Sequence, residues 1–339
     1  MTSSPVSLRA HPERNPSRVR PFVGLVCALV LSLLAGAAAH AADKVRIGVF
    51  PASSALPYYV ALERGYFKDA GIEPEAVVFT SHPLTVQAIV SGDVDGASNL
   101  VTLEGANINQ RRAGTLTYVS LNAQNREFIT EQFVVRTGHP ARTLQDLKGA
   151  RILSAPGPAN VGAAKAVLQA IGLKEGQDYT IQEQQMGVHV GALKAGSFDA
   201  GYTLEPLASV MIQQGVARRL EAGVIATYLL GRPEAKAFAA GGALANRFLN
   251  ERQAVAARYM QAWQRAVKDI ATDPTVRDLL PKYMNTSVAL APTVPLVKFM
   301  LINELSAQDL ADLQKFVDIG VEQGVVRGAI DARTFIKAF

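Results

Sequence analysis

The chain repeatedly places small hydroxyl and amide side chains where an apolar strand is predicted to give way to a helix. At the first such corner, Ser53, Ser54 and Tyr58 follow the β-forming run at 45–49 and lead into a segment at 57–66 with helical spacing of its apolar residues. The first N–H groups of a helix lack partners inside it. This corner can therefore hold a polar or anionic group by hydrogen bonds alone, although the serines could equally serve only as helix caps.

Two later corners repeat this chemistry. Ser98 and Asn99 stand in the turn expected after a short strand near 94–97, and His82 lies at the start of the helix expected at 83–90. Hydroxyl, amide and imidazole groups can each donate a hydrogen bond to an oxygen of a bound molecule. The same groups also cap helices, so both roles remain open for all three residues.

The middle of the chain supplies a second set of candidates. The loop at 155–160 consists mainly of small residues, so Gly157 and Asn160 would let its backbone approach a ligand, with Asn160 as the expected helix cap. Tyr202 and Glu205 end a strand that is predicted to be buried. The loop lacks the glycine-lysine signature of a nucleotide-binding loop, so we expect no nucleotide site.

Two charged residues bear on the charge of the ligand. Glu205 could recognise an amine, a ring nitrogen or a hydroxyl, or it could form only a structural salt bridge. An uncompensated carboxylate in a closed site would repel a simple anion. Arg126, in the loop at 122–128, is the candidate counter-charge for a sulfonate or carboxylate, because its planar fork matches their oxygens.

The residue inventory argues against several catalytic classes. The chain has one cysteine, Cys27, and its histidines show no HExxH spacing. No GxSxG nucleophile turn is present either. We therefore expect no catalytic residues, no metal site and no cofactor.

Residues 1–41 are predicted to be a cleavable Sec-type signal peptide. Four arginines precede the apolar run at 22–34, and Ala39-His40-Ala41 is a small-x-small cleavage site. The run is short for a membrane anchor, and we expect the protein in the periplasm. Cleavage would remove four arginines and one glutamate and lower the formal net charge from +5 to +2. The balance that remains argues against nucleic-acid binding.

The order of the predicted elements indicates an α/β fold. Strand-like and helix-like segments alternate from residue 45 to residue 111, and the same plan starts again at 143–149. A long amphipathic helix follows at 252–272, with further helices expected near 275–283, 294–301 and 307–323.

Four segments in this order give the chain a resemblance to a known family. They read YYVALERGYFKDAGIEPE, VQAIVSGDVDGA, TLQDLKGARI and ALKAGSFDAGYTLEP. The chain resembles the substrate-binding proteins of ABC importers in the nitrate, sulfonate and taurine group, which is related to thiamine-pyrimidine binders. The resemblance implies a type II-like periplasmic-binding-protein fold with two lobes, each a mainly parallel sheet flanked by helices. Lobe 1 would be 42–133 plus 241–339 and lobe 2 would be 134–240, with hinge strands at 133–136 and 241–245.

The resemblance also implies a function. The protein would be a monomeric receptor that delivers a sulfonate, a taurine-like, nitrate-like or carboxylate solute, or a pyrimidine, to the permease of an ABC importer and its ATPase. One alternative is an enzyme of the thiamine-pyrimidine synthase type, whose cysteine-rich motif is missing here because Cys27 falls in the leader. A ligand-sensing subunit of a signalling system is the other alternative.

Overall fold

The computed structural model describes residues 1–5, 7 and 42–339, and its folded unit is Ala42–Phe339. Apart from 1–5 and 7, the predicted signal peptide with Cys27 lies outside the described residues. No helix in the described part of the chain has the length and apolar character needed to cross a membrane.

One half of the folded unit, lobe 1, is built on a six-stranded sheet. From edge to edge its strands are β11 (Lys298–Leu301), β4 (Leu116–Gln124), β10 (Ala237–Ala245), β3 (Gly96–Val101), β1 (Asp43–Val49) and β2 (Ile72–Val78). β1 is parallel to β2 and β3, whereas β10 is antiparallel to β3 and β4, and β11 is antiparallel to β4.

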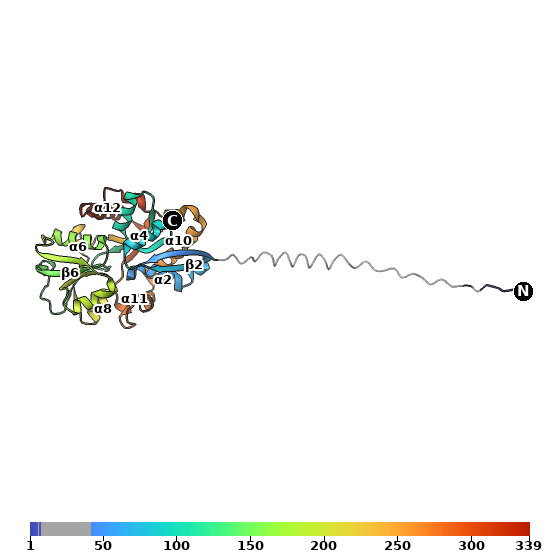
Figure 1. Cartoon of the computed structure of the whole chain (residues 1–339), viewed down its shortest axis with the longest axis horizontal. Helices are drawn as coiled ribbons and strands as arrows, with labels where there is room; N and C mark the ends of the chain where they lie inside the picture. Colours follow the sequence, from blue (N-terminus) through green and yellow to red (C-terminus); the bar gives the residue numbers. More distant parts are fainter. Residues whose placement is uncertain (6, 8–41) are drawn as a thin grey trace. The chain divides into compact units, whose positions relative to one another are not determined.

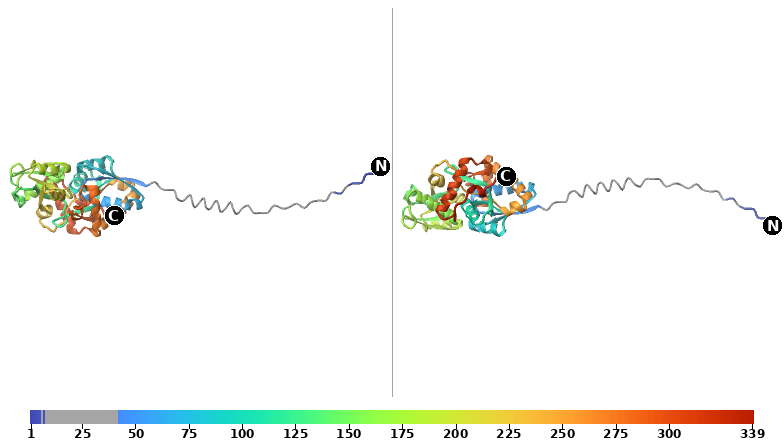
Figure 2. Two further views of the ribbon diagram at one scale, coloured as in Figure 1. Left: turned by 90° about the horizontal axis from the view of Figure 1, so that it is seen from below. Right: turned by 90° about the horizontal axis from the view of Figure 1, so that it is seen from above.

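The other half, lobe 2, is built on a five-stranded sheet. Its strands are β7 (Tyr179–Glu183), β6 (Ala150–Ser154), β8 (Ala200–Thr203), β5 (Gln132–Arg136) and β9 (Ala217–Ala222). β6 is parallel to β7 and β8, and β5 is antiparallel to β8 and β9. In Figures 1 and 2 this half is green to yellow, while blue and orange segments from distant parts of the sequence lie together in the other half.

The two sheets follow one plan, as the sequence predicts. In each, three parallel strands stand in the order second, first, third (β2-β1-β3 and β7-β6-β8), followed by one antiparallel strand (β10 or β5) and one more (β4 or β9). The two-lobed α/β architecture is therefore confirmed. The sheets are mixed rather than mainly parallel, because β10 and β5 run antiparallel to both of their neighbours.

The chain crosses between the sheets outside the segments expected from the sequence. Residues 133–136 belong to β5, which pairs only within the five-stranded sheet, and 241–245 belong to β10, which pairs only within the six-stranded sheet. The passages lie instead at 125–131 and within 223–236. We therefore propose that the lobe boundaries fall in these two connections, a few residues before the predicted ones.

Helices flank both sheets (Figure 1). Those of lobe 1 are α2 (Leu56–Glu63), α3 (Tyr66–Asp69), α4 (His82–Ser91), α5 (Thr102–Arg111), α9 (Asn246–Glu251), α10 (Gln253–Thr272), α11 (Leu280–Met284) and α12 (Ala307–Glu322). Those of lobe 2 are α6 (Pro158–Ala170), α7 (His189–Lys194), α8 (Leu207–Gln213) and a π-helical turn, η4 (Ile225–Leu229).

Three local predictions are wrong. Ser98 and Asn99 do not lie in a turn after a strand, because both belong to β3, which ends only at Val101. The segment at 294–301 is not a helix, since Lys298–Leu301 forms edge strand β11, whose pairing with β4 outweighs the local spacing of its apolar residues. Asn160 does not cap α6, because the helix begins earlier, at Pro158. Proline suits the first helical position, and Gly157 before it takes a φ of +102° that few other residues adopt.

Helix α10 anchors the centre of the six-stranded sheet. Its buried face includes Tyr259, Trp263 and Ala266, as its spacing predicts, and the Trp263 Nε1 donates to Ser120 Oγ at 3.0 Å. At Gly241 of β10 an added Cβ would stand 2.2 Å from the backbone oxygen of Ser120. Glycine at that position lets β10 pass this close to β4.

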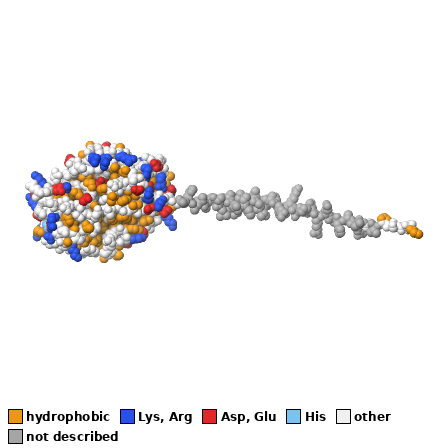
Figure 3. Space-filling view, in the orientation of Figure 1, with side chains coloured by type: hydrophobic (Ala, Val, Ile, Leu, Met, Phe, Trp, Pro, Cys, Tyr) orange, Lys and Arg blue, Asp and Glu red, His pale blue; other side chains and the backbone are white. Residues whose placement is uncertain are grey.

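On the face shown in Figure 3, basic and acidic side chains are interspersed. In the folded unit as a whole, many acidic and basic side chains form ion pairs, such as Arg258 with Asp43 at 2.5 Å. This distribution agrees with the nearly balanced charge expected after cleavage of the leader.

Replacing Gly241 by alanine should destabilise the folded unit, because the blocking atom is backbone oxygen and cannot rotate away. We expect a loss of about 1–3 kcal/mol, typical of overpacking, measured by urea unfolding of residues 42–339. Gly191→Ala on α7 is the control, because no heavy atom lies within 4 Å of the added Cβ, and it should unfold at or above the wild-type urea concentration. Equal stability of the two variants would contradict this account of β10.

Candidate functional site

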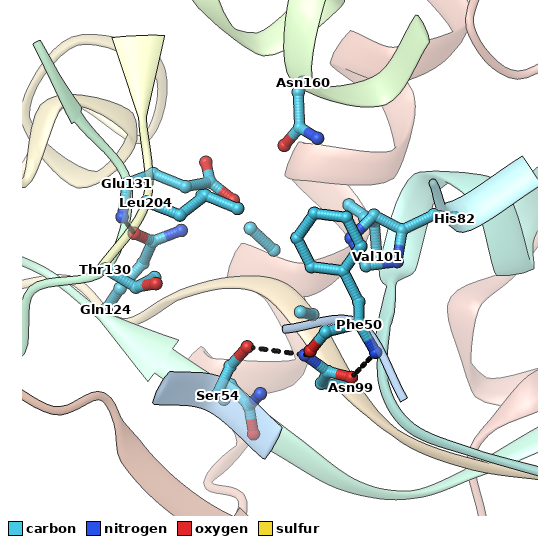
Figure 4. Close-up of a pocket in the computed structure, with 13 residues that line it drawn as sticks. Phe50, Ser54, His82, Asn99, Val101, Gln124, Thr130, Glu131, Asn160 and Leu204 are labelled. Atoms are coloured by element: carbon cyan, nitrogen blue, oxygen red, sulfur yellow. Dashed lines mark hydrogen bonds between the residues drawn. The ribbon is translucent and has the colours of Figure 1, made fainter. Parts of the chain in front are cut away.

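A cavity lies where the two lobes meet (Figure 4). β3, β4 and β10 supply residues from lobe 1, as do the segment after β1 and the start of α4. Helix α6 and the segment after β8 supply residues from lobe 2, and the passage between β4 and β5 supplies two more. The lining residues are Phe50, Ser54, His82, Asn99, Val101, Asn122, Gln124, Thr130, Glu131, Asn160, Leu204, Ala239 and Ala240.

Asn99 fixes one wall of the cavity. Its Oδ1 accepts from the backbone N–H of Phe50 at 3.0 Å and from the Ser98 hydroxyl at 2.9 Å, and its Nδ2 donates to the backbone oxygen of Phe50 at 2.9 Å and to Ser54 Oγ at 3.0 Å. Two of these bonds clamp the backbone of Phe50 at both its N–H and its carbonyl. The position of the Phe50 ring is therefore set by a buried, well-bonded amide.

Phe50 joins the two lobes. With Ala52 it packs against Ala155 and Leu204 of lobe 2 in a small buried apolar cluster. Its ring also lies 4.5 Å, centroid to centroid, from the imidazole of His82. The side chain is only 2% exposed, so separating the lobes would return apolar surface of this cluster to water.

Several polar atoms around the cavity have no hydrogen-bond partner. They are His82 Nδ1, Asn122 Nδ2 and Gln124 Nε2, from side chains that are at most 4% exposed. Complete burial lowers the pKa of His82 to about 3, so its imidazole is neutral near pH 7. Unpaired buried polar groups cost free energy, and a ligand with matching groups would recover it.

Glu131 is the acidic residue of the cavity lining. Figure 4 shows its carboxylate turned toward the interior, opposite the carboxamide of Asn160. Its Oε2 accepts a hydrogen bond from the Tyr202 hydroxyl, and its backbone N–H donates to Gln124 Oε1 at 3.1 Å. Burial raises the pKa of the Glu131 carboxyl, and the bond from Tyr202 acts in the opposite direction.

The charge on Glu131 is large enough to select a ligand by sign. At an effective dielectric constant of about 20, two unit charges about 4 Å apart interact by about 4 kcal/mol. A neutral hydrogen bond contributes only about 0.5–1.5 kcal/mol. The sign of a ligand's charge near this carboxylate therefore outweighs one or two neutral hydrogen bonds.

Four of the sequence-predicted residues line the cavity, namely Ser54, His82, Asn99 and Asn160. The Asn160 Nδ2 donates to the backbone oxygen of Pro156 at 2.8 Å, which fixes its amide in the first turn of α6.

Four other predicted residues, Ser53, Ser98, Gly157 and Tyr202, do not line the cavity but support the residues or the lobe contact around it. The Ser98 hydroxyl bonds to Asn99, and the Tyr202 hydroxyl bonds to Glu131. The backbone N–H of Ser53 donates to the backbone oxygen of Glu205 at 2.9 Å, a bond between the lobes. Gly157 opens the helix that carries Asn160, and its N–H donates to Glu183 Oε2 at 3.1 Å.

The remaining three lie away from the cavity lining. Tyr58 is wholly buried in the core of lobe 1, where its ring lies 5.5 Å from that of Phe67. Arg126 is exposed and lies 3.4 Å from Glu221.

Glu205, the third, is wholly buried in lobe 2. Its Oε1 accepts from Gln132 Nε2 at 2.8 Å and from Arg219 at 3.0 Å. Its charge is therefore compensated within the lobe, and its carboxylate does not face the cavity.

Sequence reasoning missed four polar lining residues, namely Asn122, Gln124, Thr130 and Glu131. Glu131 carries a signal in the sequence, because it is an acid directly before strand β5 (Gln132–Arg136), in the segment that joins the lobes. Asn122 and Gln124 alternate with apolar residues of β4, a spacing that also fits a core strand.

The lobes are closed in this structure. About 20 Å³ of the cavity is open to the centre of a water-sized sphere, roughly the room for one water molecule. Further contacts between the lobes lie outside the cavity, where Gln323 Nε2, directly after α12, donates to Gln169 Oε1 of α6 at 3.0 Å and Ser287 Oγ donates to Gln213 Oε1 of α8 at 3.1 Å. A solute of several heavy atoms can enter only if the lobes move apart.

No group of three or more histidine, cysteine, aspartate or glutamate side chains that could hold a metal ion occurs among the residues that the structure describes.

Residues 52–276 match a family model described as NMT1/THI5 like, which covers more than half of the chain. No curated protein sequence matches the chain.

Solved structures match the folded unit along most of its length. The alkanesulfonate-binding protein SsuA from Xanthomonas axonopodis pv. citri, bound to MOPS, superposes with a TM-score of 0.69 at 20% identity, over 88% of this chain and 99% of the other. The periplasmic nitrate-binding protein NrtA from Synechocystis PCC 6803 gives 0.68 at 13% identity, over 86% and 84%. The desulfurization enzyme DSZB gives 0.63 at 16% identity, over 87% and 96%. These likenesses confirm the expected periplasmic-binding-protein fold.

Replacing Glu131 by glutamine should stabilise the protein at neutral and alkaline pH. A carboxyl whose pKa is raised by folding stabilises the native state below its unfolded pKa near 4.5, and this contribution is lost as pH rises through the folded value. The neutral amide avoids that loss. We expect the Tm of Glu131→Gln to exceed that of the wild type at pH 8, by about 2–4 °C for each kcal/mol of charge burial removed, and the excess to shrink toward pH 4.5.

The matched control is Glu127→Gln, since Glu127 is an exposed acid in the same connection. It should leave the pH profile of Tm unchanged. A Glu131→Gln variant whose Tm difference from the wild type is the same at pH 4.5 and pH 8 would refute the buried-charge account.

Proposed function

The chain belongs to the NMT1/THI5 like family, and from that premise we propose that it is a solute-binding receptor that serves an ABC importer. Its lobes would close around one small molecule and release it unaltered to a membrane permease. This role would place the mature protein, 42–339, in the periplasm as a monomer. The names of two similar structures, a sulfonate-binding SsuA and a nitrate-binding NrtA, support the proposal.

The single observation that carries the proposal is the cavity between the lobes. Both lobes supply its lining, and three unpaired buried polar atoms face or adjoin it. A site of this kind binds most tightly when the lobes are closed, so its ligand stabilises closure by its higher affinity for that state.

The contacts between the lobes suggest how closure is balanced. The bond from the Ser53 N–H to the Glu205 oxygen and the packing of Phe50 on Leu204 both require apposed lobes. A ligand that bonds to both walls would add its own contacts to these. In our proposal the lobes therefore open more readily without solute than with it.

An enzyme on the same fold is the second candidate, because DSZB shares the architecture and its name describes a desulfurization enzyme. The cavity of this chain pairs one buried acid, Glu131, with a histidine whose lowered pKa keeps it neutral. Asn99 and Ser54 are held in hydrogen bonds to each other and to backbone. This arrangement favours recognition over proton transfer, and we propose that the protein catalyses no reaction.

The receptor proposal predicts saturable binding without turnover. A thermal-shift screen of residues 42–339 against taurine, alkyl and aryl sulfonates, nitrate, carboxylates, amines and pyrimidines should find a solute that raises Tm. Calorimetry should then give one site per chain, and mass spectrometry should recover the solute unchanged after prolonged incubation. A chemically altered solute would favour the enzyme instead.

The Asn160→Ala variant tests whether the cavity is the binding site. Loss of an amide that faces a solute should weaken binding by about threefold to tenfold, since a neutral hydrogen bond contributes about 0.5–1.5 kcal/mol. Gln177→Ala, at an exposed position in the connection between α6 and β7 of the same lobe, should leave the affinity unchanged. Equal affinities for Asn160→Ala and the wild type would place the site elsewhere.

A further inference from the structure

We infer that the solute carries a positively charged N–H group, such as an ammonium, amidinium or guanidinium, that pairs with the carboxylate of Glu131. This inference rests on the proposed receptor function and names the class of solute that the cavity selects. It differs from the anionic solutes named for the similar SsuA and NrtA structures.

The charges around the cavity are the first support. Glu131 is the only acidic or basic residue among the lining residues other than His82, and no lysine or arginine lines the cavity. His82 lies fully buried beside Phe50 and is neutral. Among its lining residues the cavity therefore offers one carboxyl group that can carry a negative charge and no group that carries a positive charge.

Arg219 and Arg126 are each held in an ion pair with another acid. Arg219 lies 3.0 Å from Glu205 and also bonds to the side chain of Gln132. Arg126 is more than half exposed and lies 3.4 Å from Glu221. Turning either toward an anionic solute would leave an acid behind without its partner, and for Glu205 that acid is wholly buried.

The position of Glu131 suits a recognition residue. It lies in the connection between β4 and β5, so it sits at the base of the cleft, close to both lobes. Tyr202 holds one carboxylate oxygen, which orients the group, and Figure 4 shows the carboxylate facing the cavity. The side chain is 5% exposed. A carboxylate so far removed from water gains strongly from a cation that donates hydrogen bonds to it.

The other lining groups complement a flat, conjugated cation. The ring of Phe50, held by the Asn99 clamp, offers an aromatic surface for an amidinium or guanidinium plane. The unpaired Nδ2 of Asn122 and Nε2 of Gln124 can donate to an acceptor elsewhere on the solute. The preferred solute thus combines a cationic N–H group with a hydrogen-bond acceptor.

Three probes of nearly the same shape separate charge from fit. Benzamidine is a cation at pH 7, benzamide is neutral and benzoate is an anion, and acetamidine, acetamide and acetate form a smaller set. We expect each amidine to bind residues 42–339 more tightly than its amide, and each carboxylate to bind weakest, by isothermal titration calorimetry. Agmatine is a further cation to test, and ethanesulfonate and nitrate are further anions.

The Glu131→Gln variant should weaken binding of the best cation by about tenfold to a hundredfold, the usual effect of losing a charged hydrogen bond. It should also improve binding of benzoate or leave it unchanged. Glu127→Gln removes an exposed acid from the same connection and should leave all affinities as in the wild type.

The outcomes separate this inference from the receptor proposal. Preferential binding of benzoate, ethanesulfonate or nitrate, or equal loss of cations and anions in Glu131→Gln, would overturn the inference and leave the receptor proposal standing. Absence of saturable binding by every cation would also overturn it. Failure of the wider thermal-shift screen as well would remove the receptor proposal itself.

Discussion

The contact of Phe50 with Leu204 and Ala155 is the interaction on which the site depends, because it holds the two lobes together at the cavity. Phe50 follows the first strand of the fold, and Asn99 in the neighbouring parallel strand bonds to both its N–H and its carbonyl. The order of the strands therefore places Asn99 beside Phe50, and the bonds from Asn99 in turn hold Phe50 where it contacts the other lobe. The parallel pairing of β1 with β3 brings Asn99 close to Phe50, the residue that follows β1.

Glu131 shows how recognition and stability oppose each other in this protein. The carboxylate lies deep in the cleft, where burial disfavours its charged form and raises its pKa, and nearby amide groups stay without partners. A fully satisfied cavity would give a more stable closed form. Such a cavity would also offer a solute nothing to bond to, so the unsatisfied groups are the part of the structure best explained by binding.

The sequence predicted the repeated strand and helix plan because periodicity is a local property, and it predicted that Ser54 and Asn160 stand where a strand gives way to a helix. It placed Asn99 in a turn, whereas Asn99 lies within β3. It could not predict which of two acids faces the cavity. Glu205 and Glu131 each lie next to a strand, but Arg219, brought near by the pairing of β9 with β5, engages Glu205. The helix prediction at 294–301 was wrong for the same reason. β11 is a strand because it pairs with β4, which lies far earlier in the chain.

The insertion of β10 between β3 and β4 has a consequence for biosynthesis. When a ribosome has completed β1 to β4, the central position of the first sheet is still empty, and its strand is synthesised only after the whole second lobe. The second sheet, by contrast, receives β5 at its outset and can be completed without later residues. We therefore expect the lobe encoded in the middle of the chain to be the first to mature during translation, with the flanking lobe assembled around it afterwards.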